Sequence, residues 1–214
     1  MTDLEAQRDE ARRLGEAMRL VIDRLVATQA PGEDLARAAD QLEAIAAGLS
    51  TYPQRRIYDG FAESANAGDT HAFFEWSPLI GHANPLAPPI SVEIQDDLVV
   101  GRARFGSAYE GPPGCVHGGF IAASFDDVLG VAQSLSGQPG MTGTLTIRYR
   151  KPTPLYRDLV FKARLVSIEG RKIATRGELY AGDAMTAEAD GLFISVGAVK
   201  FQQLMEERDA RSAR

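Results

Sequence analysis

The chain has 214 residues, of which 44% are hydrophobic and 24% charged, and its formal net charge is −6. This composition predicts one globular domain with an appendage, and the acidic balance argues against strong nucleic-acid binding. A single cysteine excludes an intrachain disulfide framework. The sequence has no apolar run near the roughly 20 residues that span a bilayer, and Met1–Arg13 lacks the apolar core of a signal peptide. We therefore expect a soluble cytoplasmic protein.

Two amphipathic helices are predicted at the N-terminus. The first covers residues 3–29, where apolar residues recur at alternating three- and four-residue spacing. These residues are Leu4, Ala11, Leu14, Met18, Val21 and Leu25. Pro31-Gly32 ends this helix, and a second is expected at 33–49. Residues 1–52 are interpreted as a helical-hairpin arm with an apolar seam, which packs on its own domain or on a partner subunit. A regulatory or docking role is the alternative.

Residues 53–89 are rich in Pro, Gly and Ala and have no clear hydrophobic period. We expect an irregular connecting segment here. His71 and His82 both lie in it, each without the spacing to other ligands that a metal site needs, so no metal site is predicted. The main domain is expected at 90–200, followed by a charged tail at 201–214.

Six short segments predict a sheet within the main domain. They are 90–95, 98–105, 145–150, 159–168, 173–180 and 187–196. An apolar helical segment lies between the second and third of them. The order of one hairpin, one long helix and an antiparallel meander predicts an α+β fold, in which a curved antiparallel sheet wraps around one central helix. Along the third strand, alternation places Leu145, Ile147 and Tyr149 on one face and Thr144, Thr146, Arg148 and Arg150 on the other.

The central helix is preceded by Gly-Pro-Pro-Gly-Cys-Val-His-Gly-Gly, residues 111–119. The prolines restrict the backbone and predict a rigid turn. The N–H groups of the first helical turn have no partner within the helix. Gly118 and Gly119 can therefore present bare N–H groups to a carbonyl oxygen, as acyl transfer requires. Asp126 and Asp127 lie farther along, on either side of the apolar stripe, so the helical wheel does not choose between them.

Three blocks of the chain resemble the hotdog-fold acyl-CoA thioesterases. Within them, the closest branch includes the 4-hydroxybenzoyl-CoA, phenylacetate-pathway and thioesterase-superfamily-member enzymes. The first block is His-Gly-Gly at 117–119, with an acidic residue nine positions after the His, here Asp126. The second is Thr-x-x-Leu-x-Ile-x-Tyr-x-[Lys/Arg]-Pro at 142–152, and the third is a basic hairpin turn at 166–172. The resemblance covers about residues 90–197 and implies a hotdog fold.

The resemblance also implies residue roles in thioester hydrolysis. Asp126 attacks the thioester carbonyl or activates a water, two routes that the sequence does not separate. The Gly118 N–H binds the carbonyl oxygen. Thr142 matches a family Ser or Thr that holds the water or the carboxylate, with an ordinary strand-start residue as the alternative. His117 braces the turn and contributes to the thioester pocket. A triad of His117 with a Ser or Cys nucleophile is not favoured, and no cofactor is expected.

Substrate-binding groups are implied as well. Gly119 leaves the backbone open to the substrate. Gly111 stands where some family members carry an Asn or Gln, which leaves the second electrophilic group unidentified. CoA carries phosphates, for which the basic candidates are Arg148, Arg150, Lys151, Arg171 and Lys172; solvated surface charges are the alternative for each. The family site lies between two subunits, so at least a homodimer is implied, and a dimer of dimers stays open.

Three other functions compete with a thioesterase. A hotdog protein that binds acyl-CoA without turnover, as a sensor or regulator, is the main alternative, although a pure binder needs no carboxylate beside the thioester. A hydratase or dehydratase on the same fold requires a different local motif, which is absent. A purely structural protein built on the helical arm is the remaining class.

Overall fold

The computed structural model describes residues 3–53 and 75–196. The chain divides into two compact units, 1–86 and 87–214. This division falls close to the predicted start of the main domain at residue 90. The predicted tail at 201–214 and His71 lie outside the described residues.

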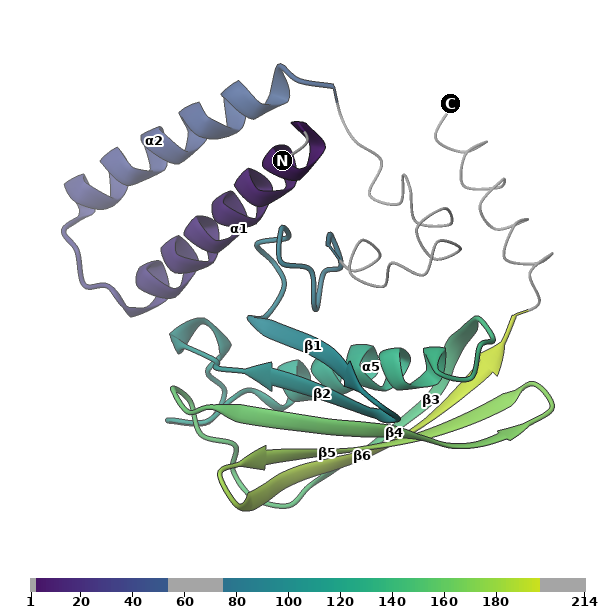
Figure 1. The fold of residues 1–214 in the computed structure, drawn as a ribbon. Coiled ribbons are helices and arrows are strands. Elements are labelled where there is room, and N and C mark those ends of the chain that lie inside the picture. Colours follow the sequence, from purple (N-terminus) through teal and green to yellow (C-terminus); the bar gives the residue numbers. More distant parts are fainter. Residues whose placement is uncertain (1–2, 54–74, 197–214) are drawn as a thin grey trace. The chain divides into compact units, whose positions relative to one another are not determined.

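Two helices form a hairpin in the first unit, as predicted (Figure 1). Helix α1 spans Asp3–Ala27 and helix α2 spans Gly32–Ser50. The larger side chains of the predicted apolar seam are between 38% and 57% exposed in the single chain. They are Leu14, Met18, Val21 and Leu25 of α1 and Leu35, Leu42, Ile45 and Leu49 of α2. Packing of the seam on the main domain or on a partner subunit stays a prediction.

Polar contacts hold α1 to the end of the connecting segment. Arg12 donates from Nε and Nη2 to the two carboxylate oxygens of Glu75, at 2.7 and 2.6 Å. Arg19 donates to two backbone carbonyls of the same segment, at 2.9 and 3.0 Å. Between these arginines, a Cβ on Gly15 would lie 2.9 Å from the Ala83 carbonyl oxygen. The helix therefore approaches this backbone on a face that glycine keeps open.

The second unit is built on one antiparallel sheet of six strands (Figure 1). The strands are β1 (Ile90–Gln95), β2 (Leu98–Ala103), β3 (Gly140–Tyr149), β4 (Leu159–Glu169), β5 (Lys172–Ala181) and β6 (Ala184–Ser195). Their order is β1-β2-β4-β5-β6-β3, so β1 and β3 are the edges. Strand β3 begins at Gly140, five residues before the predicted start at residue 145. The prediction started too late because a register shift between Thr142 and Thr144 interrupts the alternation by which a strand is predicted.

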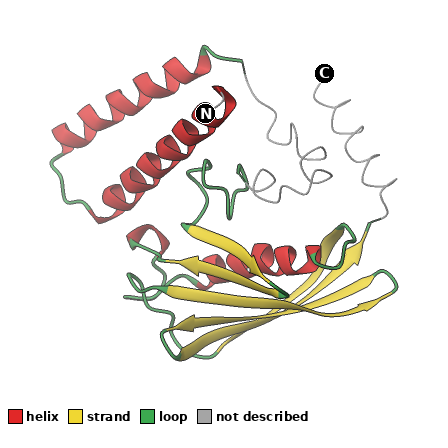
Figure 2. Ribbon diagram, in the orientation of Figure 1, coloured by secondary structure: helices red, strands yellow, loops and turns green. Residues whose placement is uncertain are grey.

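Helix α5 (Gly118–Ser134) covers one face of this sheet (Figures 1 and 2). Its buried stripe includes Phe125, whose ring packs edge-to-face on Phe161 of β4 with centroids 5.2 Å apart. Gly177 and Gly191 allow the close approach, since a Cβ on either would lie 3.2 Å from Leu129 of α5. Each large apolar side chain buried here contributes roughly 1.5–3 kcal/mol. The predicted α+β fold, a curved sheet around one helix, is confirmed.

Candidate active site

A tight turn fixes the approach to α5. The Cys115 N–H donates to the Pro112 carbonyl at 2.9 Å, and Gly114 has φ +72°, which a type II turn requires at its third residue. The Glu110 carboxylate accepts from the Gly114 N–H at 2.6 Å. The Gly111 N–H donates to the Cys115 carbonyl at 2.9 Å. These bonds close the predicted rigid loop on itself.

The imidazole of His117 caps the start of α5. Its Nδ1 accepts a hydrogen bond from the Gly119 N–H at 3.0 Å, so the proton of the neutral ring lies on Nε2. Within the described part of the chain, the Gly118 N–H has no acceptor. Of the two N–H groups predicted to be bare, that of Gly118 is available and that of Gly119 is engaged in the cap.

Tyr149, the last residue of β3, lies against this helix start. Its hydroxyl donates to the Gly118 carbonyl at 2.8 Å. A Cβ on Gly118 would lie 3.3 Å from the Tyr149 ring, so the glycine makes room for the phenol. A side-chain hydrogen bond therefore links the end of β3 to the start of α5.

Asp126 and Thr142, predicted from separate blocks, are brought together. Asp126 is partly buried on α5, and the Thr142 hydroxyl donates to its Oδ1 at 2.8 Å. Simple alternation would turn Thr142 to the same face as Thr144, away from the helix. The extra residue at Gly143 reverses this and points Thr142 toward α5.

Ser124 and Cys115 do not form a catalytic pair with His117. Ser124 is fully buried, and its hydroxyl donates to the Phe120 carbonyl of its own helix at 2.7 Å. The Cys115 thiol contacts the Pro113 carbonyl at 3.6 Å. Neither side chain is oriented by the imidazole, in agreement with the expectation that no triad is present.

The predicted basic residues lie at two opposite ends of the sheet. Arg150 and Lys151 follow β3 at the end where α5 begins, and Arg150 is ion-paired with Glu188. Arg171 and Lys172 lie at the β4–β5 turn, at the other end, where Arg171 donates to a β6 carbonyl at 3.1 Å. A single chain therefore does not gather them into one phosphate site.

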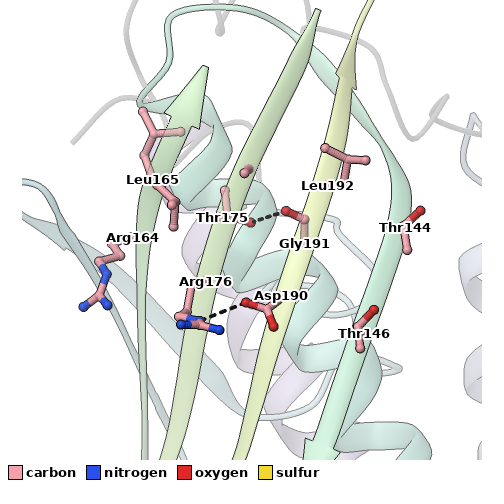
Figure 3. A pocket seen from close by; sticks show the side chains of 11 residues that line it. Thr144, Thr146, Arg164, Leu165, Thr175, Arg176, Asp190, Gly191 and Leu192 are labelled. Atoms are coloured by element: carbon pink, nitrogen blue, oxygen red, sulfur yellow. Dashed lines mark hydrogen bonds and ion pairs between the residues drawn. The ribbon is translucent and has the colours of Figure 1, made fainter. Parts of the chain in front are cut away.

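A hollow of about 630 Å³ lies on the sheet face turned away from α5 (Figure 3). Arg176 donates to Asp190 Oδ1 at 2.8 Å, and Arg148 to Oδ2 at 2.7 Å. These two guanidinium groups hold the pKa of Asp190 below its ordinary value. Because Asp126 and Gly118 belong to α5, behind the sheet, we place the candidate active site at the helix and not in this hollow.

Within residues 3–53 and 75–196, no three or more His, Cys, Asp and Glu side chains are grouped so as to hold a metal ion. No helix in these ranges is long and apolar enough to cross a membrane.

Comparison with known proteins gives the family. The Thioesterase superfamily profile matches residues 113–188. A crystal structure of a thioesterase superfamily protein is 35% identical, has a TM-score of 0.74, and is matched over 86% of this chain and 94% of its own. The chain belongs to the thioesterase superfamily. The predicted family resemblance and the hotdog fold are thereby confirmed.

Curated relatives of this superfamily member carry a more specific name. Acyl-coenzyme A thioesterase THEM4 of Mus musculus is 39% identical over 93 residues, which are 42% of this chain and 40% of THEM4. Acyl-coenzyme A thioesterase THEM5 of Homo sapiens is 32% identical over 143 residues, 66% of this chain and 57% of THEM5. The chain thus spans about two fifths of the length of the THEM4 proteins it matches.

Proposed function

We propose that this protein hydrolyses the thioester of an acyl-CoA to a free acid and CoA. One observation carries the proposal: a single helix bears a carboxylate hydrogen-bonded to Thr142 and, at its start, a Gly118 N–H group that has no acceptor among residues 3–53 and 75–196. Acyl transfer needs a group that delivers the nucleophile and a donor for the developing oxyanion. The relatives named acyl-coenzyme A thioesterase support the same reaction.

The working site needs two copies of the chain. Gly118 and Asp126 are eight residues apart, which separates them by roughly 12 Å along the helix axis. A reacting carbonyl must lie about 3 Å from both its oxyanion donor and its attacking group. One chain therefore cannot supply both. A second helix running antiparallel would bring its own Gly118 beside Asp126 of the first.

Strand β3 offers the surface for such a homodimer. It is an edge of the sheet and is ten residues long, so one row of its backbone groups has no strand beside it among residues 3–53 and 75–196. Antiparallel pairing of two β3 strands extends the sheet and relates the two helices by a two-fold axis. The same symmetry moves Arg171 and Lys172 of one copy to the end that carries Arg150 and Lys151 of the other. The CoA phosphates would bind at this end.

Two chemical routes fit these groups. As a general base, Asp126 takes a proton from a water, and the resulting hydroxide adds to the carbonyl carbon while the Gly118 N–H stabilises the oxyanion. The C–S bond then breaks, and the proton held by Asp126 passes to the CoA thiolate. As a nucleophile, Asp126 adds to the carbonyl carbon, the C–S bond breaks with release of the CoA thiolate, and water hydrolyses the resulting mixed anhydride to the free acid and the Asp126 carboxylate. In either route, the Thr142 hydroxyl donates to Asp126 Oδ1 and orients the carboxylate. Asp126 Oδ2 then takes the proton or attacks the carbonyl. A Cβ on Gly119 would lie 3.1 Å from His117 Nδ1 and one on Gly111 would lie 2.7 Å from His117 Cα, so both glycines make room for His117.

The proposal is tested by thiol release from a panel of aliphatic and aromatic acyl-CoAs. We expect turnover by the wild type and a loss of at least about 100-fold in Asp126→Asn, because the carboxamide neither takes a proton nor attacks. Asp127→Asn makes the same change one position along, away from Thr142, and should retain most of the activity. Binding of acyl-CoA without thiol release from any of them would reject hydrolysis and favour the sensor function.

A single turnover in ¹⁸O-labelled water distinguishes the general-base route from hydrolysis of an anhydride at the Asp126 carboxyl. A general base activates a labelled water that adds to the substrate carbonyl, so the label appears in the free acid and not in Asp126. If a nucleophilic Asp126 forms the mixed anhydride and water attacks its Cγ, the label enters Asp126 and the free acid leaves with an unlabelled Asp126 oxygen, which mass spectrometry of the peptide that contains Asp126 would detect.

A further inference from the structure

We infer that Tyr149 is a positioning residue for the oxyanion donor, an inference that rests on the proposed function. Its hydroxyl does not touch the reacting atoms. It acts through the backbone of the first helical turn, where the N–H of Gly118 has to point at the developing oxyanion.

The peptide between Gly118 and Gly119 is held at both ends. Its carbonyl accepts from the Tyr149 hydroxyl at 2.8 Å, and its N–H donates to His117 Nδ1 at 3.0 Å. On the other side, the His117 N–H donates to the Tyr109 carbonyl at 2.8 Å. The peptide groups before and after the Gly118 N–H are therefore both fixed. First-turn N–H groups have no intrahelical partner and fray easily, so this clamp keeps an unpaired donor in one direction.

The phenol ring adds a steric element to this clamp. The Tyr149 side chain is 53% exposed in the single chain. A Cβ on Gly118 would lie 3.3 Å from both the ring and its hydroxyl oxygen. Any side chain at 118 would press on the phenol and disturb the bond to the carbonyl. The hydrogen bond from Tyr149 therefore requires a glycine at position 118.

Strand β3 positions both halves of the candidate site. Thr142 and Tyr149 are seven residues apart, and an uninterrupted strand would turn them to opposite faces. The bulge at Gly143 brings both to the face that carries α5, where one contacts Asp126 and the other Gly118. The edge strand thus aligns the carboxylate and the oxyanion donor along one helix.

The first test is Tyr149→Phe, which removes the hydroxyl and keeps the ring on Gly118. Tyr180→Phe is the matched control, because its hydroxyl donates to Glu178 on the same strand at 2.9 Å, remote from α5. We expect kcat to fall about 10-fold in Tyr149→Phe with KM within twofold, less than the 10²–10³-fold loss of a whole oxyanion donor. Tyr180→Phe should keep the wild-type kcat. An unchanged kcat in Tyr149→Phe would overturn the inference and leave the proposed hydrolysis standing.

The second test does not use activity. Solvent exchange of backbone amides is measured by NMR in both variants and in the wild type. We expect the Gly119 amide to exchange at least about fivefold faster in Tyr149→Phe, while Ala132 near the end of α5 is unchanged. Equal rates at Gly119, or the same acceleration throughout α5, would overturn the inference, the latter because it marks a general loss of stability. Faster exchange at Gly119 in a protein that releases no thiol would support the positioning role and reject the proposed function.

Discussion

The hydroxyl of Thr142 donates a hydrogen bond to the carboxylate of Asp126 at 2.8 Å, and a single extra residue in β3 makes this contact. Without the bulge at Gly143, Thr142 would face away from α5 together with Thr144. An edge strand tolerates such a bulge well, because it has only one neighbour whose ladder is disturbed. The irregular part of the strand is therefore the part that serves the candidate site.

Thr142→Val is expected to lower kcat by about 10-fold, since a charge-assisted hydrogen bond of about 1.5–3 kcal/mol that orients the carboxylate is lost. Thr142→Ser keeps the hydroxyl and should restore most of the rate. Thr144→Val, on the same strand but the opposite face, is the control and should be neutral. Steady-state thiol release measures all three. Equal rates for Thr142→Val and Thr144→Val would show that the contact has no role in turnover.

Gly111→Ala is expected to lower the melting temperature and the activity together. Its Cβ would lie 2.7 Å from the His117 Cα, a backbone atom that cannot move without displacing the helix start. Overpacking of this kind costs about 1–3 kcal/mol. Gly48→Ala in α2 has open space around the added methyl and should be neutral or slightly stabilising. Thermal unfolding with parallel activity assays checks both variants. A Gly111→Ala protein with wild-type stability would contradict the prediction, because it would show that the loop backbone shifts to accommodate the added methyl group.

Asp190→Asn is expected to weaken the fold at neutral pH and to flatten its acid sensitivity. Arg176, and then Arg148, hold the pKa of the Asp190 carboxyl below its ordinary value of 3.8. A lowered folded-state pKa contributes stability above the ordinary value, and that contribution is lost as the pH falls through the lowered pKa. The carboxylate is 38% exposed, so we expect a shift of only a few degrees in melting temperature. Melting curves between pH 2 and 7 test this, with Asp183→Asn in the β5–β6 turn as control. Parallel curves for Asp190→Asn and the wild type would contradict it.

Arg12→Ala is expected to loosen α1 from the end of the connecting segment, where Glu75 lies. The change leaves a carboxylate that is only 5% exposed without its two hydrogen bonds, at a cost of about 1–3 kcal/mol. Arg12→Ala combined with Glu75→Gln removes the stranded charge and should recover part of the loss. Limited proteolysis measures the effect as a faster cleavage rate in this unit. Cleavage at the wild-type rate in Arg12→Ala would show that the ion pair is dispensable.

Local patterns were enough to predict most of the fold. The 3.6-residue period predicted α1 and α2, and the turn residues with apolar alternation predicted the sheet around one helix. The packing of the arm's apolar seam on its own domain or on a partner subunit stays a prediction. Periodicity shows which residues share a face, but it does not show whether another surface covers that face.

In the candidate site too, the sequence indicated some residues, whereas the contacts of others depend on the tertiary structure. His117, Gly118 and Asp126 lie within one helix and its cap, where spacing in the chain is spacing in space. Helical spacing left Asp126 and Asp127 as candidates, and the family resemblance selected Asp126. The orientation of Thr142, the capture of the Gly119 N–H by His117, and the contact of Tyr149 with Gly118 depend on strand register and on packing between distant segments. One inserted residue reverses every side chain beyond it. Such details therefore exist only once β3 has been paired with β6 and packed on α5.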